Sequence, residues 1–407
     1  MGQLSTAAFL IFAAAKVVVI FTVWLLGVAG VTLVERKVAA WIQDRSGPNR
    51  VGPWGVFQPL ADGLKNFVKE ESLPAAASRW LFYIAPVISM FPAFVVFAVI
   101  PVAAPLPTPW GTVPMVIADL PIGFLFVIAL ASLGVYGLVL GGWASNSKYP
   151  FLGGVRASAQ MISYEIALGL SLVPILMLAG NVSLPEIVAQ QQETLWFFLP
   201  LMVGFLFFSV AYFAETNRAP FDMPEAESEL VYGFHTEYSA MKMAMFYMAE
   251  YSNMIVASAL MATFFFGGWD IPFWSGDNLR VTADGSIVGG SAAWWVTLLT
   301  AMMFAAKTAF FVFLFIWVRW TIPRFRYDQV MSLGWKVMIP LLVVYIVFLG
   351  AVMLLLEGAG ITFGLRYSLW LTGLNFIGVL GVMFWLDRKR VIVGTGWKQV
   401  RPQQQVR

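Results

Sequence analysis

Nine long runs of apolar residues extend through most of the 407-residue chain. A helix that crosses about 30 Å of hydrocarbon needs roughly 20 residues at 1.5 Å per residue. The runs cover residues 7–34, 80–104, 117–140, 158–180, 194–214, 240–268, 292–318, 336–357 and 367–386. Membrane strands would be about half as long and would alternate in polarity, which these runs do not. The sequence therefore predicts an all-α polytopic membrane protein with about nine transmembrane helices.

The composition excludes several other kinds of protein and site. Apolar residues make up 60% of the chain and charged residues 12%, whereas a soluble domain carries about 25% charged residues. The absence of cysteine excludes disulfide scaffolds, thiolate metal sites and cysteine nucleophiles. With a single histidine, His235, neither a histidine metal cage nor a Ser–His–Asp triad is credible. The sequence also lacks a Gly-rich phosphate loop, so we expect no metal site here and redox cofactors only on other chains.

The distribution of basic residues predicts the orientation of the chain in the membrane. Cytoplasmic loops carry an excess of Lys and Arg. Of the 25 basic residues, 21 lie on one side of the membrane. They are in segment 35–79, in every second connection after it and in the C-terminal tail. The opposite side holds only Arg280 and Arg366. We therefore expect the N-terminus outside and the C-terminus in the cytoplasm or its organellar equivalent. The first run continues into Glu35-Arg36-Lys37 without a basic start, so it is not a cleaved signal peptide.

A stretch of mixed polarity, residues 54–71, follows the first run. Helical spacing puts one group of side chains on an apolar face and another on a polar face. The apolar face holds Phe57, Leu60, Ala61, Leu64, Phe67 and Val68, and the polar face Asp62, Lys65, Asn66 and Lys69. Such a pattern is typical of an amphipathic helix that lies in the membrane interface. From the residues alone, a helix packed on another protein is an equal alternative.

Three charged residues lie deep inside predicted spans: Glu165, Glu250 and Lys307. Each costs a few kcal/mol at membrane depth unless it is paired or hydrated. Burial raises a carboxyl pKa and a nearby cation lowers it, so such groups can exchange protons near neutral pH. We interpret Glu165 and Glu250 as parts of a proton or ion path, with a structural pair to a base on a neighbouring span as the alternative. Lys16 lies nearer the outer end, where its side chain can reach the interface.

The connection 215–239 is acidic on a side that is otherwise basic. Residues 215–237 hold six carboxylates against Arg218 alone: Glu215, Asp222, Glu225, Glu227, Glu229 and Glu237. A solvated polar loop is the usual meaning of such a run. Phe221 and the apolar residues 230–234 are unusual in a free loop, however, and Pro220 and Pro224 restrict its path. Carboxylates crowded in a partly buried place share protons with coupled pKa values, which suits a proton relay.

Longer motifs recur in order over about residues 10–357. They include Glu35-Arg36-Lys37, Gln43-x-Arg45-x-Gly47-Pro48-Asn49, Gln58-Pro59-Leu60-Ala61-Asp62-Gly63, Arg156-Ala157-x-Ala159-Gln160, the acidic loop 214–238, Met248-Ala249-Glu250-Tyr251 and Pro323-Arg324-Phe325-Arg326. These motifs resemble the family of H-type membrane subunits of respiratory complex I, the NADH-quinone oxidoreductase, also called the NADH dehydrogenase subunit 1 family. Motifs of this length are highly specific.

The resemblance implies a subunit at the junction of the hydrophilic and membrane arms of complex I. Quinone would enter from the bilayer through a tunnel framed by the first and sixth spans and the interfacial helix. By the resemblance, the tunnel and acidic loop take Glu35, Arg36, Arg45, Asp62, Arg218, Phe221, Asp222, Glu225, Glu227 and Glu229. A proton relay toward the antiporter-like subunits takes Glu165, Glu215, Glu237 and Glu250, and we assign Lys307 to it as well. The loop 215–239 is expected to rearrange as quinol forms and so to bias protonation of Glu165 and Glu250.

The resemblance also implies the cofactors and partners of this chain. The substrate would be ubiquinone or menaquinone, and NADH, FMN and the iron–sulfur clusters would sit on partner subunits. Those partners would be hydrophilic quinone-module subunits and small and antiporter-like membrane subunits, in a cell (inner or plasma) membrane. Residues 1–357 would form the family's membrane domain, and residues 358–407 a ninth span with a basic cytoplasmic tail. The alternatives are the related subunit of a membrane-bound hydrogenase or another donor's complex, and a stand-alone proton or ion transporter.

Overall fold

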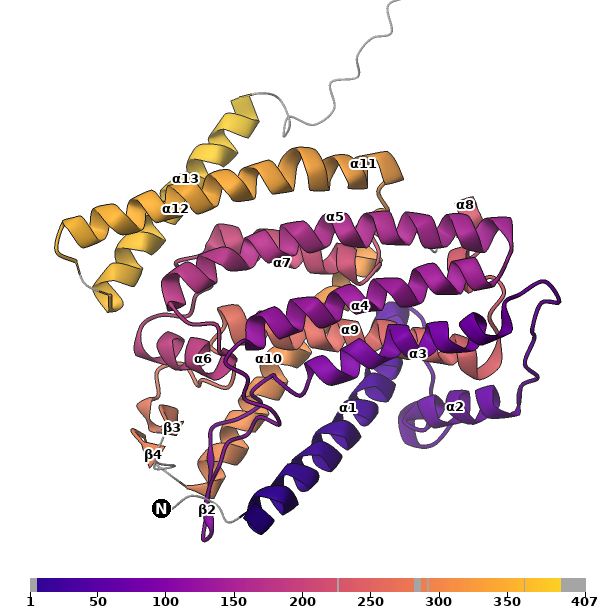
Figure 1. Ribbon diagram of the computed structural model, residues 1–407, viewed down its shortest axis with the longest axis horizontal. Helices are drawn as coiled ribbons and strands as arrows, with labels where there is room; N and C mark the ends of the chain where they lie inside the picture. Colours follow the sequence, from indigo (N-terminus) through magenta and orange to yellow (C-terminus); the bar gives the residue numbers. More distant parts are fainter. Residues whose placement is uncertain (1–5, 225–226, 282–286, 291–292, 362, 389–407) are drawn as a thin grey trace, which may run out of the picture.

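Long helices run side by side through the whole molecule (Figure 1). The computed structural model describes residues 6–224, 227–281, 287–290, 293–361 and 363–388. The long helices are α1 (Thr6–Ile42), α3 (Arg79–Val96), α4 (Gly123–Ala144), α5 (Lys148–Ala179), α7 (Met202–Glu215), α9 (Ala240–Phe265), α10 (Trp294–Thr321), α12 (Ile339–Gly358) and α13 (Leu365–Arg388). Each overlaps one of the nine predicted runs, so the predicted helical architecture is confirmed.

Short elements cap the two ends of these helices. The helices α2 (Gln58–Val68), α8 (Glu227–Leu230) and α11 (Tyr327–Ser332) lie at one end, which we call the α2 end (Figure 1). A π-helical stretch, Leu333–Met338, joins α11 to α12, and 3₁₀ turns occupy Pro53–Gly55, Gly233–His235 and Ser275–Asp277. At the other end, which we call the hairpin end, lie helix α6 (Leu184–Glu193) and two antiparallel hairpins, of β1 (Leu106–Thr108) with β2 (Gly111–Val113) and of β3 (Arg280–Val281) with β4 (Ile287–Val288).

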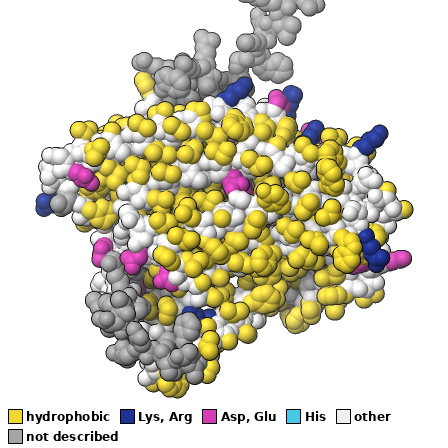
Figure 2. Space-filling model, viewed as in Figure 1, with side chains coloured by type: hydrophobic (Ala, Val, Ile, Leu, Met, Phe, Trp, Pro, Cys, Tyr) yellow, Lys and Arg dark blue, Asp and Glu magenta, His cyan; other side chains and the backbone are white. Residues whose placement is uncertain are grey.

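Six helices are long and apolar enough to cross a membrane, counted over the described ranges. They are α1, α3, α4, α5, α10 and the continuous stretch Tyr327–Gly358. Figure 2 shows hydrophobic side chains over most of one face, with the Lys and Arg side chains in this view mostly toward its edges. The chain is therefore a mainly helical membrane protein.

The predicted span 194–214 is wrong at its start. Its helix, α7, begins at Met202 and has 14 residues, or about 21 Å at 1.5 Å per residue. Non-helical backbone in a membrane must find hydrogen-bond partners within the protein. Asn375 of α13 supplies one, because its buried side-chain Nδ2 donates to the Pro200 carbonyl over 2.8 Å. The run was apolar throughout, so its hydropathy could not reveal the break.

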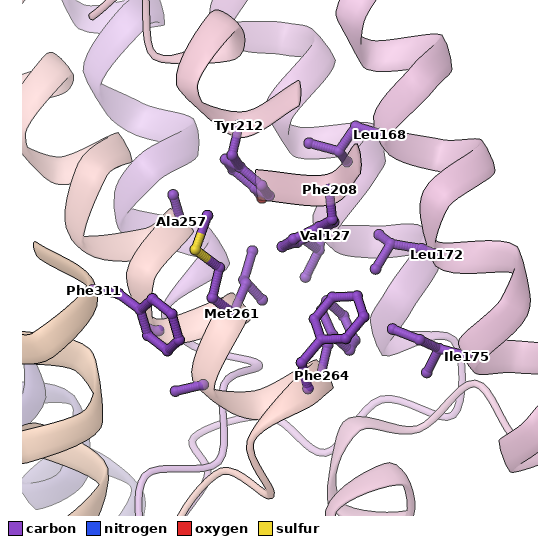
Figure 3. Packing of buried hydrophobic residues seen from close by; sticks show 14 of the residues in the cluster. Val127, Leu168, Leu172, Ile175, Phe208, Tyr212, Ala257, Met261, Phe264 and Phe311 are labelled. Atoms are coloured by element: carbon purple, nitrogen blue, oxygen red, sulfur yellow. The ribbon is translucent and has the colours of Figure 1, made fainter. Parts of the chain in front are cut away.

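Helix α9 occupies the centre of the bundle, where it contacts α1, α3, α6, α7 and α10. Its second half, from Met254 to Phe265, is buried. Figure 3 shows side chains from five helices packed together there: Val127 of α4, Leu168, Leu172 and Ile175 of α5, Phe208 and Tyr212 of α7, Ala257, Met261 and Phe264 of α9, and Phe311 of α10. A core this dense holds the polar groups described below in fixed positions.

Close packing of α3 on α4 gives a test of the fold. A Cβ atom added at Gly137 of α4 would lie 2.5 Å from the backbone nitrogen of Ser89, whereas one added at Gly134 meets no atom within 4 Å. We expect Gly137→Ala to lower stability by about 1–3 kcal/mol through overpacking. Gly134→Ala, in the same helix, should be neutral or slightly stabilising because alanine favours helix. Thermal unfolding in detergent measures both, and equal midpoints would contradict the packing.

Candidate functional site

A buried arginine lies at the centre of the most strongly charged site. Arg218 follows the end of α7 and is 3% exposed. Its Nη1 atom is 3.1 Å from both carboxylate oxygens of Glu35 in α1, and its Nε atom is 2.5 Å from Oε1 of Glu250 in α9. Arg319, in the last turn of α10, also pairs with Glu35. Three long helices and one loop thus bring two cations and two carboxylates together, with no formal net charge.

The surroundings of Arg218 keep it charged. Its guanidinium lies 4.3 Å from the centre of the Tyr251 ring, in a cation–π contact. The Tyr251 hydroxyl also lies close to Glu35. Burial alone would lower the pKa of Arg218, but the charges of Glu250 and Glu35 raise it above the ordinary value. Arg218 is therefore a permanent cation, and any change of charge in this cluster must come from its carboxylates or from a neighbouring molecule.

A local anchor explains why the loop folds over this cluster. The buried Gln160 of α5 donates from Nε2 to the carbonyls of Ala214 and Phe221 over 2.9 and 2.8 Å, and to Oδ1 of Asn217 over 3.1 Å. Asn217 has φ of 49°, a left-handed conformation that asparagine tolerates better than most residues. Together they turn the chain back after α7 and direct Arg218 inward.

A cavity adjoins the cluster on the far side of Glu250. It measures about 60 Å³ and is lined by Glu215, Asn217 and Glu250, with His235 and apolar residues of α3, α4 and α9 around them. One water molecule needs about 10–15 Å³, so the cavity can hold several. Burial lowers the pKa of His235 to about 3, so this imidazole is neutral at physiological pH.

Glu215 and Glu165 extend the row of carboxylates away from Glu250. Glu215, at the end of α7, is buried, and its carboxylate is close enough to that of Glu165 for the two to repel. Glu165, in the middle of α5, is half-buried and accepts a hydrogen bond from Ser132 of α4. The structure therefore connects four of the predicted carboxylates in order: Glu35 and Glu250 share Arg218, Glu250 and Glu215 line one cavity, and Glu215 lies near Glu165.

On the opposite side, Arg36 connects α1 to α2. Its Nη1 atom is 2.5 Å from Oδ2 of Asp62, whose other oxygen accepts from Gln58 over 3.2 Å and lies 3.7 Å from Nζ of Lys65. Burial raises the pKa of Asp62, but the hydrogen bond and charge of Arg36 outweigh it and leave that pKa below the ordinary value. Asp62 is therefore an anion at neutral pH. Arg45 lies nearby in sequence but is exposed and bonds Gln43.

The acidic loop is less crowded than its sequence suggests. Asp222 is 2.8 Å from Arg324, and Glu229 is 2.7 Å from Arg156. Burial raises the pKa of Asp222, although Arg324 and Arg319 draw it down. The Phe221 ring packs between Tyr164 and Phe325, and Glu237 is half-buried. Glu225 lies outside the described residues, and Glu227 is described only for its backbone in α8.

Two predicted membrane lysines lie away from this line. Lys307 of α10 donates from Nζ to the carbonyls of Phe266, Gly268 and Asp270 over 2.6, 3.1 and 2.6 Å, where α9 ends. It also lies 4.2 Å from the Trp196 ring centre. Lys16 donates to the carbonyls of Pro114 and Val116 over 3.1 and 2.7 Å. Both lysines donate to backbone carbonyls at the hairpin end, and the predicted relay role of Lys307 stays a prediction.

Sequence reasoning missed three residues of the site. Arg319 was counted only as a topological charge, because nothing in its own helix indicates a partner near residue 35. Tyr251 and Gln160 occur within recognised motifs but had no assigned role. A glutamine in an apolar run is a detectable signal of a buried anchor, since an unpaired amide there is costly. Within the described ranges, the structure holds no group of three or more His, Asp or Glu side chains that could bind a metal ion.

Comparison with known proteins gives consistent matches. A family model described as NADH dehydrogenase matches residues 15–350. The NADH-quinone oxidoreductase H subunit 1 of Cytophaga hutchinsonii is 47% identical over 339 residues, which are 83% of this chain and 96% of that protein. The corresponding H subunit 1 of Geobacter metallireducens and H subunit 2 of Geobacter sulfurreducens are each 49% identical, over 341 and 340 residues, or 84% of this chain and 96% of each relative. The family model ends within α12, before α13 begins.

The central ion pairs can be tested by removing one charge. Arg218→Gln leaves Glu35 and Glu250 buried without their shared cation, and breaking a buried pair in this way costs about 3–5 kcal/mol. The control Arg326→Gln removes an exposed partner of Asp328, 3.3 Å away, and should cost less than about 1 kcal/mol. Thermal unfolding of the detergent-solubilised protein compares the two variants. Similar midpoints would contradict a structural dependence on Arg218.

Proposed function

The chain belongs to the NADH dehydrogenase family, and on that premise we propose that it is the H-type membrane subunit of a proton-pumping NADH-quinone oxidoreductase, complex I. In this role it forms much of the access tunnel for quinone and the charged path that couples quinone reduction to proton translocation. The observation that carries the proposal is the line of carboxylates that begins at the buried pair of Glu35 with Arg218. The names of the relatives favour this reading over the hydrogenase subunit and the stand-alone transporter.

Three helices support the proposed entrance. At the α2 end, α1, α2 and α9 contact one another. None of the residues of α2 is buried, and its apolar side chains Leu60, Leu64 and Phe67 are 64%, 59% and 72% exposed. An amphipathic helix with this face is suited to lie in the headgroup region, which is where we place the entrance for the isoprenoid substrate. NADH, FMN and the iron–sulfur clusters then belong to partner subunits of the complex.

The proposed coupling uses the charge balance of the central cluster. Reduction of a quinone to quinol takes up two protons, which changes the charge close to Asp62, Arg36 and Glu35. In a low-dielectric site, a changed charge acts over a long distance. Arg218 and Arg319 are shared by several acids. When one of these acids loses its negative charge, the two cations attract the remaining carboxylates more strongly. The population of protonated Glu250, Glu215 and Glu165 shifts accordingly, and water in the adjoining cavity can carry the proton.

The proposed topology has nine spans: α1, α3, α4, α5, α7, α9, α10, α12 and α13. The N-terminus lies outside, and the α2 end, with its basic connections, faces the cytoplasm and the hydrophilic arm. A bacterial inner or plasma membrane is the proposed location. The predicted connections on the hairpin side contain only two basic residues, Arg280 and Arg366, and this shortage of Lys and Arg supports the orientation. The basic tail of the predicted extension lies outside the described residues.

The relay role is tested best at Glu215, because glutamine keeps the shape of this side chain and removes its proton exchange. We expect Glu215→Gln to lower the number of protons translocated per NADH oxidised, by at least about tenfold if the path is single. The measurement is pH-dependent dye quenching beside NADH oxidation in membrane vesicles that contain the whole complex.

The matched control is Glu186→Gln, since Glu186 is an exposed acid of α6 at the hairpin end. This control should pump normally. Unchanged proton translocation in the Glu215→Gln vesicles, at the same rate of NADH oxidation, would remove Glu215 from the path.

A further inference from the structure

The segment that follows α2 is fastened to the start of α9. The backbone N–H of Ser72 donates to Oγ of Ser239 over 2.9 Å, and the two serine hydroxyl oxygens are 2.8 Å apart. Ser72 comes four residues after the end of α2, and Ser239 immediately precedes α9. Two hydrogen bonds at one position fix the distance between these elements, although Ser72 itself is exposed.

A buried lysine strengthens the same junction. Lys242, in the first turn of α9, is 4% exposed. Its Nζ atom lies 3.3 Å from Oε2 of Glu71 and 3.5 Å from the carbonyl oxygen of Ser72. It also lies 4.4 Å from the ring centre of Tyr83 and 5.0 Å from that of Phe82, both in α3. An ammonium enclosed by a carboxylate, a carbonyl and two aromatic rings is held in one position, because each group attracts it.

The body of α2 is tied to the opposite wall by a different pair. Arg36 of α1 holds Asp62 in the first half of α2 at 2.5 Å. Helix α2 is therefore attached to α1 through Arg36 and to α9 through Glu71, Ser72 and Lys242. Its apolar face remains exposed between these two ties. A further hydrogen bond joins the segment after α2 to the end of α4: the Asn146 side chain donates to the carbonyl of Ala76 over 3.1 Å.

We propose that Lys242 is a positioning residue that holds α2 against α9 and thereby sets the selectivity of the quinone entrance for the length of the isoprenoid tail. This inference rests on the proposed function, since the entrance lies between α1, α2 and α9. Lys242 is absent from the line of acids around Arg218, so its effect is on passage and not on proton exchange. A long tail still occupies the entrance when the headgroup is inside, whereas a short tail clears it. Loosening α2 therefore affects long-tailed substrates most.

The test uses membranes that contain the whole complex and compares two quinones, one with a single isoprenoid unit and one with a long polyisoprenoid tail. We expect Lys242→Gln to raise KM for the long-tailed quinone by about threefold or more. KM and kcat for the short-tailed quinone should change less than about twofold. Lys242→Arg keeps the charge and should restore most of the long-tail KM.

Glu71→Gln should reproduce the effect of Lys242→Gln, and the double variant should be no worse than either single one, because the two side chains act as one contact. The matched control is Asp328→Asn, which breaks an exposed ion pair of α11. This variant should leave KM for both quinones unchanged. Equal KM changes for short and long tails in Lys242→Gln would overturn the proposal.

A second measurement is independent of quinone turnover. The chain contains no cysteine, so S72C with S239C introduces its only thiol pair. The rate at which an added oxidant, copper phenanthroline, converts the two thiols to a disulfide reports how closely the segment after α2 stays against α9. We expect Lys242→Gln to slow this reaction, and the formed cross-link to return the long-tail KM of that variant toward the wild-type value.

The two possible failures are distinguishable. An unchanged cross-linking rate, or a formed cross-link that leaves the raised KM in place, overturns the role of Lys242 even when the complex reduces quinone. Wild-type membranes without NADH-driven quinone reduction instead contradict the proposed function, while a slowed cross-link in Lys242→Gln would still support the tie itself.

Discussion

One buried guanidinium holds the charged centre of this protein together. Removing Arg218 from water is costly, and that cost is offset only because Glu35 and Glu250 approach it from α1 and α9. Inside this helical bundle, a buried charge that lacks a protein partner would face only lipid or trapped water. The pairing also determines the path of the chain after α7, because the loop must turn inward for Arg218 to reach both acids. The positions of three helices at the α2 end therefore depend on one side chain.

In the proposed coupling, the same arrangement makes the site respond to a change of charge. A cation that cannot lose its proton, placed between acids that can, passes any change of charge on one side to the other. The apolar core of α4, α5, α7 and α9 fixes these distances (Figure 3), while the cavity beside Glu250 leaves room for water. Fixed distances between the acids and room for water molecules are two conditions that a proton path needs. Lys16 and Lys307 lie away from this cavity and bind backbone carbonyls at the hairpin end.

Much of this could be predicted from the sequence, for reasons that particular residues make clear. Hydropathy located the helices, because a span must be apolar along its length, and helical spacing located α2. Hydropathy failed at residues 194–201, where the backbone leaves the helix and Asn375, far away in sequence, satisfies a free carbonyl. Charges at membrane depth identified Glu165 and Glu250, but their partners lie far away in the sequence, Ser132 in α4 and Arg218 in the loop after α7. The pairing of Glu35 with Arg319, 284 positions apart, depends on tertiary packing that no local pattern encodes.

The central claim is that buried carboxylates around Arg218 change protonation as quinone is reduced. Redox-triggered infrared difference spectroscopy of the complex in membranes tests it most directly. The account predicts a band from a protonated carboxyl group that appears or vanishes with quinone reduction and is lost when Glu250 or Glu215 is replaced by glutamine. A difference spectrum without any carboxyl band, or with bands that survive both replacements, would contradict the claim and leave these residues a structural role alone.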